Sequence, residues 1–167
     1  MENLVSGTQL LSFYRNRKIF ITGHTGFKGS WLTCVLEILG ARTMGYALAP
    51  EQEGGLFDYL ENNNSTSVIN DIRDRGALRR AINEFNPDLI FHLAAQPLVR
   101  RSYEIPAETF DINVTGTANL LEAAAALQGK CAIVVITTDK VYQNREENVL
   151  YKEHDTLGGH DPYSASK

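Results

Sequence analysis

The sequence predicts an α/β fold, a doubly wound parallel sheet with helices on both faces. Short apolar segments alternate with helical patterns along the chain, an order typical of parallel strands joined by right-handed crossovers. A glycine-rich segment follows the first apolar segment and opens the first long helical pattern. At 167 residues the chain is long enough for one hydrophobic core and too short for two ordinary domains.

The first half of the chain contains three predicted strands, over residues 18–22, 42–47 and 67–70. The first is a compact apolar run that ends in glycine, as a buried parallel strand does. A short leading helix is expected over residues 8–16. Between the first two strands, apolar residues recur at helical spacing over 27–39, and Gly40 stops that helix. Residues 48–64 are rich in Gly, Asn, Glu and Pro, which predicts a loop with one helical turn near 56–60.

The second half continues the same alternation. Asp74 is placed to cap a helix whose apolar face comprises Ala77, Leu78, Ala81, Ile82 and Phe85. Residues 88–93 predict a fourth strand, 106–127 a long helical stretch, and 132–137 a fifth strand of β-branched residues. Another helix opens at 161–163, shortly before the sequence ends. We therefore expect an incomplete domain that lacks its substrate-binding part and is inactive by itself.

Composition and charge exclude several classes of function. A formal net charge of −4 does not suit a nucleic-acid backbone as partner. No apolar run approaches the roughly 20 residues that cross a bilayer, and the N-terminus has no signal-peptide pattern. We therefore expect a cytoplasmic protein that binds neither nucleic acid nor membrane. Cys34 and Cys131 are expected to be buried thiols, with a disulfide as the alternative. His154 and His160 have no Cys or carboxylate at ligand spacing, so no metal site is expected.

Gly23, Gly26 and Gly29 form a G-x-x-G-x-x-G loop between the first strand and the first long helix. Gly23 permits a tight turn, Gly26 lets a pyrophosphate approach the backbone, and Gly29 lets the helix pack closely on the strand. The helix N-terminus then offers unpaired N–H groups and a partial positive charge to phosphates. A tight turn without a ligand is the alternative. In this position the loop predicts a Rossmann-like site, and residues 1–167 are interpreted as an NAD(P)-binding domain.

The end of the second strand leaves the choice of cofactor open. An acidic residue there selects NAD in many such sites, and a basic residue accommodates the 2′-phosphate of NADP. Residues 43–47 contain neither, so the sequence does not decide between NAD and NADP. Asp71, just after the third strand, is a candidate acceptor for the adenine amino group. A helix or turn cap is an equally good account of Asp71.

Two polar segments carry candidate catalytic groups. Tyr163 and Lys167 share a helical face at i, i+4, and a neighbouring ammonium group favours the phenolate form of a tyrosine. Thr138, Asp139 and Lys140 leave the fifth strand at the edge where ligands bind in open α/β sheets. A hydroxyl, a carboxylate and an amine there could supply a hydrogen-bond donor, a general acid and a general base. Taken alone, this segment is better explained as a polar turn.

Several segments resemble the extended short-chain dehydrogenase/reductase family, and within it the CDP-glucose 4,6-dehydratase branch. They are TGHTGFKGSWL (22–32), HLAAQPLVRRSY (92–103), NVTGT (113–117), TDKVY (138–142) and GGHDPYSASK (158–167). The glycine loop and the Tyr–Lys pair are typical of the whole superfamily, whereas 96–103 and Asp139-Lys140 discriminate further. Sugar-nucleotide 4,6-dehydratases as a group have Thr-Asp-Glu where this chain has Thr138-Asp139-Lys140, and the lysine is similar to the CDP-glucose branch.

The resemblance implies a lyase that makes CDP-4-keto-6-deoxyglucose from CDP-glucose with tightly held NAD, by transient oxidation at C4, loss of water and hydride return to C6. It implies that Tyr163 takes the proton of the 4-hydroxyl and that Thr138 hydrogen-bonds the C4 oxygen. Asp139 would protonate the departing 6-hydroxyl, and Lys140 would remove the C5 proton if its amine is held neutral. Asn113 would buttress the site or make a structural contact. His24 and His92 are expected to make packing or backbone contacts.

The resemblance also implies which residues hold the cofactor. These are Gly23, Thr25, Gly26, Phe27, Gly29, Asp71, Ile72, Leu93, Ala94, Ala95, Tyr163 and Lys167. A homodimer or higher homo-oligomer is expected for the full-length protein, with a role in deoxysugar synthesis for lipopolysaccharide O-antigen. Two alternatives stay open. One is an extended-family epimerase or reductase acting on another nucleotide sugar, and the other is an inactive dinucleotide-binding fragment.

Overall fold

A computed structural model describes residues 6–50, 53–60 and 65–167. Its sheet has five parallel strands in the order β3-β2-β1-β4-β5. The strands are β1 (Lys18–Thr22), β2 (Arg42–Ala47), β3 (Ser65–Ile69), β4 (Leu89–His92) and β5 (Ala132–Val135). The predicted doubly wound parallel sheet is therefore confirmed. The strand order reverses between β1 and β4, which creates the switch point where ligands bind in such sheets.

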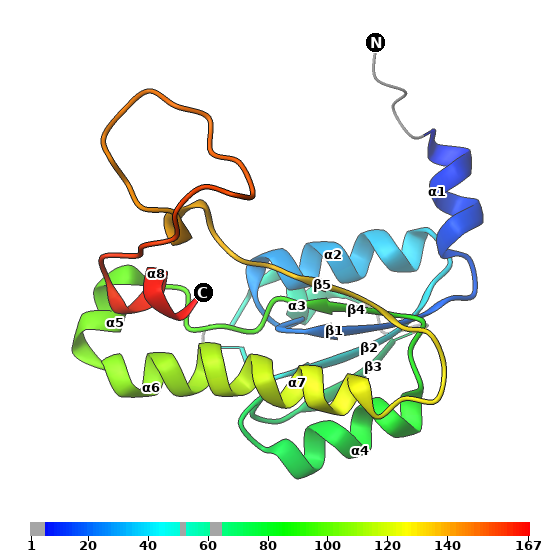
Figure 1. The fold of residues 1–167 in the computed structure, drawn as a ribbon. Helices are drawn as coiled ribbons and strands as arrows, with labels where there is room; N and C mark the ends of the chain where they lie inside the picture. The colour runs from blue at the N-terminus through cyan, green and yellow to red at the C-terminus, as the bar shows by residue number, and fades with distance from the viewer. Residues whose placement is uncertain (1–5, 51–52, 61–64) are drawn as a thin grey trace.

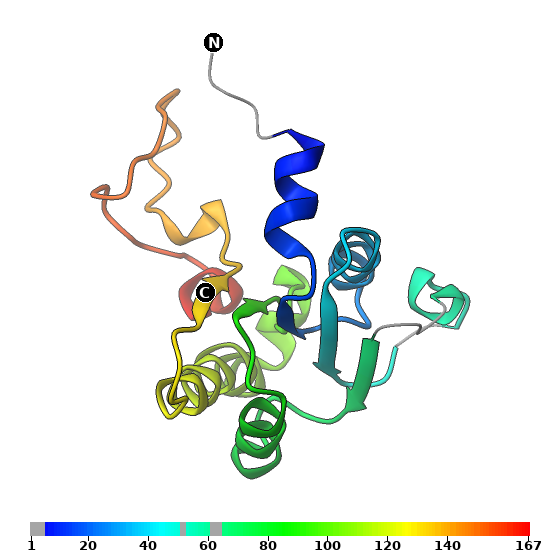
Figure 2. The same ribbon diagram turned by 90° about the vertical axis from the view of Figure 1, so that its right-hand side faces the viewer.

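Helices cover both faces of the sheet (Figure 1). They are α1 (Gly7–Tyr14), α2 (Phe27–Ile38), α3 (Leu56–Tyr59), α4 (Arg75–Phe85), α5 (Val99–Glu104), α6 (Pro106–Phe110), α7 (Gly116–Ala125) and α8 (Pro162–Ser166). A π-helical turn, η1 (Asp111–Thr115), joins α6 to α7, and a 3-10 turn, η2 (Asp139–Val141), follows β5. Figure 2 shows α2 and α3 on one side of the sheet and α4 and α7 on the other. In the described part of the chain no helix has the length and apolar character needed to cross a membrane.

Some predicted boundaries differ from the structure. Strand β3 begins at Ser65 rather than Ser67, and β5 ends at Val135 rather than Thr137. The helix expected over 106–127 is divided by η1, and α5 was not predicted at all. Of the predicted loop 48–64, residues 51–52 and 61–64 lie outside the described residues, while α3 forms the expected helical turn. Cys34 and Cys131 are free thiols, partly rather than fully buried.

Strand β1 carries the two halves of the core because its alternate side chains point to opposite faces of the sheet. Phe20 belongs to a cluster with residues of α4 and α7, including Leu78, Ile82 and Leu120, all fully buried. Ile19 and Ile21 pack with Leu36 of α2 in a second cluster. Asp74 caps α4 as predicted, since its Oδ1 accepts a hydrogen bond from the Ala77 N–H at 3.0 Å.

Helix α2 turns its small residues toward the sheet. Gly29, Ser30 and Thr33 are buried there together with Leu36. The large apolar residues Phe27, Trp31, Val35 and Ile38 are exposed along the opposite side. The helical spacing seen in the sequence is therefore real, but only part of the apolar set faces the core.

Leu78→Ala should lower the free energy of unfolding by about 2–5 kcal/mol, because the fully buried side chain leaves a cavity between α4 and the sheet. Leu121→Ala is the matched control, since Leu121 of α7 is 43% exposed and should cost far less. Urea denaturation followed by circular dichroism gives both values. An equal loss of unfolding free energy in the two variants would contradict the placement of Leu78 in the core.

Candidate cofactor and catalytic site

The loop between β1 and α2 contains backbone contacts that only glycine permits. A Cβ on Gly29 would lie 2.0 Å from the Gly23 carbonyl oxygen, and one on Gly23 would lie 2.8 Å from the Ala94 nitrogen. Gly23 also has a φ of 75°, in the left-handed region that glycine adopts without strain. Helix α2 therefore starts directly against the end of β1 and beside the segment that follows β4.

The N-terminus of α2 has no side-chain cap. Its N-cap is Gly26, so no side chain of that residue caps the first-turn N–H groups. Among the described residues other than its two chain neighbours, only the Gly23 carbonyl oxygen would lie within 4 Å of a Cβ on Gly26, at 3.5 Å. The Ser30 hydroxyl stabilises the loop, since it lies within hydrogen-bond distance of the carbonyl oxygens of His24 and Gly26, at 3.0 and 2.9 Å. Uncapped N–H groups at a helix N-terminus beside open space fit a pyrophosphate group.

The other predicted cofactor residues lie at the same edge of the sheet. Thr25 donates a hydrogen bond to the Leu48 carbonyl oxygen at 2.9 Å, which fixes the glycine loop to the chain leaving β2. Phe27, at the start of α2, is 79% exposed. Leu93, Ala94 and Ala95 follow β4 directly. The structure thus brings together residues from the ends of β1, β2 and β4.

His92 occupies the centre of a buried hydrogen-bond chain. Thr22 Oγ1 accepts hydrogen bonds at 3.1 Å from two backbone N–H groups after β4, so its hydroxyl donates to His92 Nδ1 at 2.7 Å. The ring proton then lies on Nε2, which donates to Thr117 Oγ1 at 2.9 Å. Thr117 in turn donates to the Asn113 carbonyl oxygen at 2.5 Å. Burial, with a smaller effect of the Lys167 charge, lowers the pKa of His92 to about 4, so the ring is neutral.

His24 is buried in a different environment. Its ring lies over Gly45 of β2, where a Cβ would come within 2.2 Å of the ring atoms. Its Nε2 atom lies 2.7 Å from Ser67 Oγ on β3, and Phe57 packs edge-on against the ring. Burial lowers the pKa of His24 to about 4. Both histidines therefore have the packing role that the sequence suggested, although their partners are side chains.

Asn113 ties the segment after β4 to the final helix. Its Oδ1 accepts from the Gln96 N–H at 2.8 Å, and its Nδ2 lies 3.2 Å from the Gln96 carbonyl oxygen and 2.8 Å from Ser166 Oγ. Asn113 sits in the π-helical turn η1 and is 3% exposed. These are structural contacts with α8 and with the segment after β4, one of the two accounts expected for Asn113, and its role in supporting the site stays a prediction.

Helix α8 brings the two candidate catalytic segments together. Asp161 caps it, accepting from the Ser164 N–H at 2.9 Å and the Ser164 hydroxyl at 2.6 Å. The helix carries Tyr163 and packs against α5, α6 and η2, so the segment Thr138–Lys140 is its neighbour. Lys167 follows the helix, and burial lowers the pKa of its amine. Segments that are distant in sequence thus meet beyond the carboxyl end of β5.

The residues of η2 are less enclosed than those of α8. Thr138 Oγ1 donates to Asp139 Oδ1 at 3.2 Å, and the carboxylate is otherwise open to solvent. Lys140 is exposed as well. The burial that would favour a neutral amine is therefore not supplied by the described residues around Lys140.

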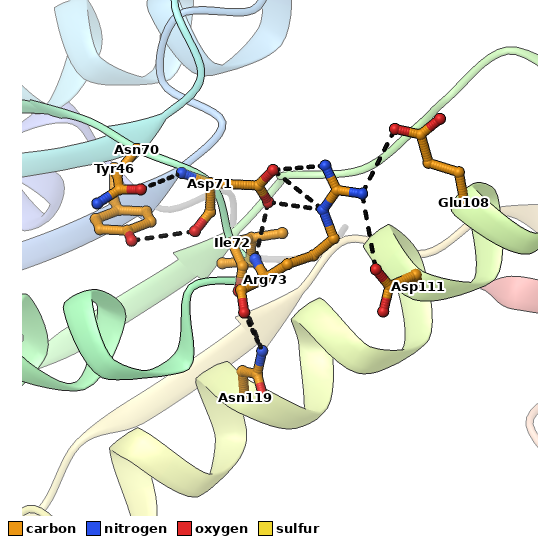
Figure 3. Close-up of polar contacts among 8 residues, drawn as sticks. All are labelled: Tyr46, Asn70, Asp71, Ile72, Arg73, Glu108, Asp111 and Asn119. Carbon is orange, nitrogen blue, oxygen red and sulfur yellow. Dashed lines mark hydrogen bonds and ion pairs between the residues drawn. The ribbon is translucent and has the colours of Figure 1, made fainter.

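Asp71 makes contacts that the sequence predicted only in part. Its Oδ1 accepts from the Arg73 N–H at 2.9 Å, so the turn-capping role is present. The Arg73 side chain also pairs with the carboxylate, and its hydrogen bonds hold the pKa of Asp71 below its ordinary value (Figure 3). Ile72 follows Asp71 and is buried. Neither the Arg73 contacts nor the Thr22–His92–Thr117 chain was expected from the sequence, because neither corresponds to a known spacing.

Known proteins match this chain over most of its length. The family model described as GDP-mannose 4,6 dehydratase matches residues 20–167. A CDP-glucose 4,6-dehydratase from Salmonella typhimurium is 49% identical over 93% of this chain and 44% of its own length. A CDP-paratose 2-epimerase from Salmonella typhi is 31% identical over 90% of this chain and 49% of its own length. The chain spans about half the length of the curated relatives it matches.

Solved structures show the same architecture. An epimerase from Methanothermobacter thermautotrophicus superposes with a TM-score of 0.82 at 26% identity, over 94% of this chain and 46% of that one. A Thermus thermophilus UDP-glucose 4-epimerase in complex with NAD gives a TM-score of 0.77 at 28% identity, over 90% of this chain and 47% of that one. The described sheet and helices thus correspond to about half of each of these enzymes.

The two buried histidines predict a pH dependence of stability. Because their pKa values are lowered from 6.5 to about 4 on folding, the stability that depends on their neutral rings is fully present above pH 6.5. It should be lost progressively as the pH falls toward 4. NMR titration of the imidazole signals measures both pKa values, with the exposed rings of His154 and His160 as reference signals. A midpoint near 6.5 for His24 or His92 would contradict the buried, neutral assignment.

Proposed function

The chain belongs to the GDP-mannose 4,6 dehydratase family, and on that premise we propose that residues 1–167 are the cofactor-binding and catalytic part of a CDP-glucose 4,6-dehydratase. The observation that carries the proposal is the packing of η2 against α8. This packing brings together the elements that carry an acid, two amines and a phenol, beyond the carboxyl end of β5. The 49% identity to the Salmonella typhimurium enzyme supports CDP-glucose as substrate.

The proposed cofactor is NAD. Thr25, Phe27 and the three glycines of the loop would lie along its phosphates, and Asp71 and Ile72 would contact the adenine. Leu93, Ala94 and Ala95 would lie along the part of the cofactor between its adenine and its nicotinamide. Tyr163 and Lys167 would contact the nicotinamide ribose. The NAD complex of the Thermus thermophilus relative supports a nicotinamide dinucleotide. Residues 43–47 hold neither an acidic nor a basic side chain, so NADP stays the alternative cofactor.

In this proposal Tyr163 begins the reaction. When bound, the nicotinamide would supply redox chemistry, accepting a hydride from C4 of the sugar and returning it to C6. Tyr163, as phenolate, takes the proton of the 4-hydroxyl, and the Lys167 ammonium stabilises that phenolate. Thr138 donates a hydrogen bond to the C4 oxygen and holds it in place.

The loss of water is assigned to η2. The 4-ketone acidifies the C5 proton, which Lys140 removes when its amine is neutral, and Lys140 returns that proton to C5 when the hydride is delivered to C6. Asp139, when protonated, gives its proton to the 6-hydroxyl, which leaves as water. Its exposure gives Asp139 direct access to solvent protons after each turnover.

A second candidate is an epimerase, favoured by the similarity to the CDP-paratose and UDP-glucose epimerases. It would need no acid at Asp139, because an epimerase loses no water. For either activity we propose a cytoplasmic location and a homo-oligomer. The exposed apolar face formed by Phe110, Val114 and Leu121 along α6, η1 and α7 supports the contact between copies.

The direct test uses the full-length protein with CDP-glucose and NAD, with UDP-glucose and GDP-mannose as substrate controls. We expect a 4-keto-6-deoxy product from CDP-glucose and no net reduction of the cofactor. Tyr163→Phe should lower kcat by roughly 10²–10⁴-fold, since it removes the proton acceptor, while the NAD affinity stays nearly unchanged. Near-normal turnover in this variant would remove Tyr163 from the mechanism. An epimerised sugar without loss of water would favour the second candidate.

Asp139→Asn separates oxidation from dehydration. The amide cannot give a proton to the leaving hydroxyl, so oxidation at C4 should proceed while loss of water stops. Reduced nicotinamide should then accumulate, which absorbance spectroscopy detects. Glu84→Gln serves as the control, because it removes an exposed carboxylate on α4, a helix on another part of the molecule from η2. Unchanged product formation in Asp139→Asn would assign the acid to another group.

A further inference from the structure

We propose that Arg73 is a positioning residue for cofactor recognition, holding the Asp71 carboxylate in the orientation that accepts a hydrogen bond from the adenine amino group. The inference rests on the proposed dinucleotide function. It goes beyond that function by explaining how the site would distinguish adenine from a purine that lacks the amino group. Arg73 itself would not touch the cofactor.

The contact between the two side chains fixes the direction of the carboxylate. Arg73 Nη2 lies 2.6 Å from Asp71 Oδ2, and Nε lies 3.0 Å from each carboxylate oxygen. The Arg73 backbone N–H donates to Oδ1 as well, at 2.9 Å. Figure 3 shows the guanidinium group side-on to the carboxylate. Such a two-point contact restricts both side-chain torsions of an aspartate.

The contact leaves part of the carboxylate open to one more donor. An ionised carboxylate has about four lone-pair positions, and three N–H groups of Arg73 approach Asp71, with the single Nε hydrogen shared between the two oxygens. The Asp71 side chain is 29% exposed, so a further donor can reach it. Hydrogen bonds from Arg73 lower the pKa of Asp71, which keeps the carboxylate ionised and able only to accept. The adenine amino group is a donor and would match it.

The backbone beneath Asp71 is held independently of Arg73. Tyr46 donates from its hydroxyl to the Asp71 carbonyl oxygen at 3.1 Å. Asn119 Nδ2 of α7 lies 3.3 Å from the carbonyl oxygens of both Ile72 and Arg73. Gly116 lets α7 approach, since a Cβ there would lie 2.6 Å from Ile72. The position of the segment thus has its own supports, and the direction of the carboxylate depends on Arg73.

Arg73 is in turn held by two acidic residues, one in α6 and one in η1. Its Nη1 atom lies 3.5 Å from Glu108 Oε1 and 3.7 Å from Asp111 Oδ2. All of these side chains are partly exposed, so the ion pairs add little to folding stability. Their effect is to select one rotamer of the guanidinium group, and through it one orientation of Asp71.

The test compares two cofactors in the full-length protein by calorimetry. NAD has an amino group on its purine, and nicotinamide hypoxanthine dinucleotide has a carbonyl oxygen at the same position, which an ionised Asp71 would repel. We expect wild type to prefer NAD by roughly ten-fold or more, because a site that accepts from the amino group leaves the carbonyl analogue unpaired. Arg73→Met should reduce this preference several-fold. Arg73→Lys keeps the charge and should give an intermediate ratio.

Two further variants make the result specific. Asp71→Asn should abolish or reverse the preference, because an amide can donate to the carbonyl analogue. Arg75→Met is the matched control, since Arg75 of α4 likewise forms an ion pair between elements, with Glu122 of α7. Its cofactor ratio should equal that of wild type.

The outcomes separate the inference from the function on which it rests. If Arg73→Met and Arg73→Lys weaken both cofactors equally and leave the ratio unchanged, Arg73 has only a structural role and the inference is overturned. If Asp71→Asn changes the ratio and neither Arg73 variant does, the adenine contact stands and only the positioning role fails. If wild type binds neither dinucleotide, the proposed function itself fails.

Discussion

Helix α2 meets strand β1 at a distance that only glycine allows, and the site is built around that contact. With 2.0 Å between a Cβ on Gly29 and the Gly23 carbonyl oxygen, any side chain would push the helix outward. The close contact aims the uncapped end of α2 at the crevice where the strand order reverses. It also explains why α2 buries its small residues and leaves its large apolar ones exposed.

The second requirement is that the ends of β1 and β4 keep one relative position. The hydrogen bonds of Thr22 and His92 satisfy it, because one hydroxyl accepts from the backbone after β4 while it donates to the ring. Through Thr117 the same chain reaches Asn113, which holds α8. The helix with the proposed catalytic tyrosine is thus connected to the strand that supports the glycine loop. Each polar side-chain group in this chain has a hydrogen-bond partner, which favours a single arrangement.

Much of the fold could be predicted because its signals are local. The glycine spacing, the Asp74 cap and the spacing of Tyr163 and Lys167 each involve residues near in sequence. The division of the long helix at η1 could not be predicted, because Asn113 is drawn toward Gln96 and Ser166 from elsewhere in the chain. The same holds for the contacts of Arg73 with Glu108 and Asp111, and for α5, which lacks a side-chain cap. Such features depend on which segments meet in space.

The outward face of α2 also gives the molecule an intrinsic optical reporter. Trp31 is the single tryptophan of this chain, lies two residues after Gly29 of the glycine loop and is 52% exposed. Its indole is excited without interference from any other tryptophan here. Reduced nicotinamide absorbs where indole emits, so energy transfer from Trp31 would follow the oxidation state of a dinucleotide held at the loop. Trp31 lies among the exposed apolar residues Phe27, Val35 and Ile38 of α2, and its emission would shift to the blue if another surface covered them.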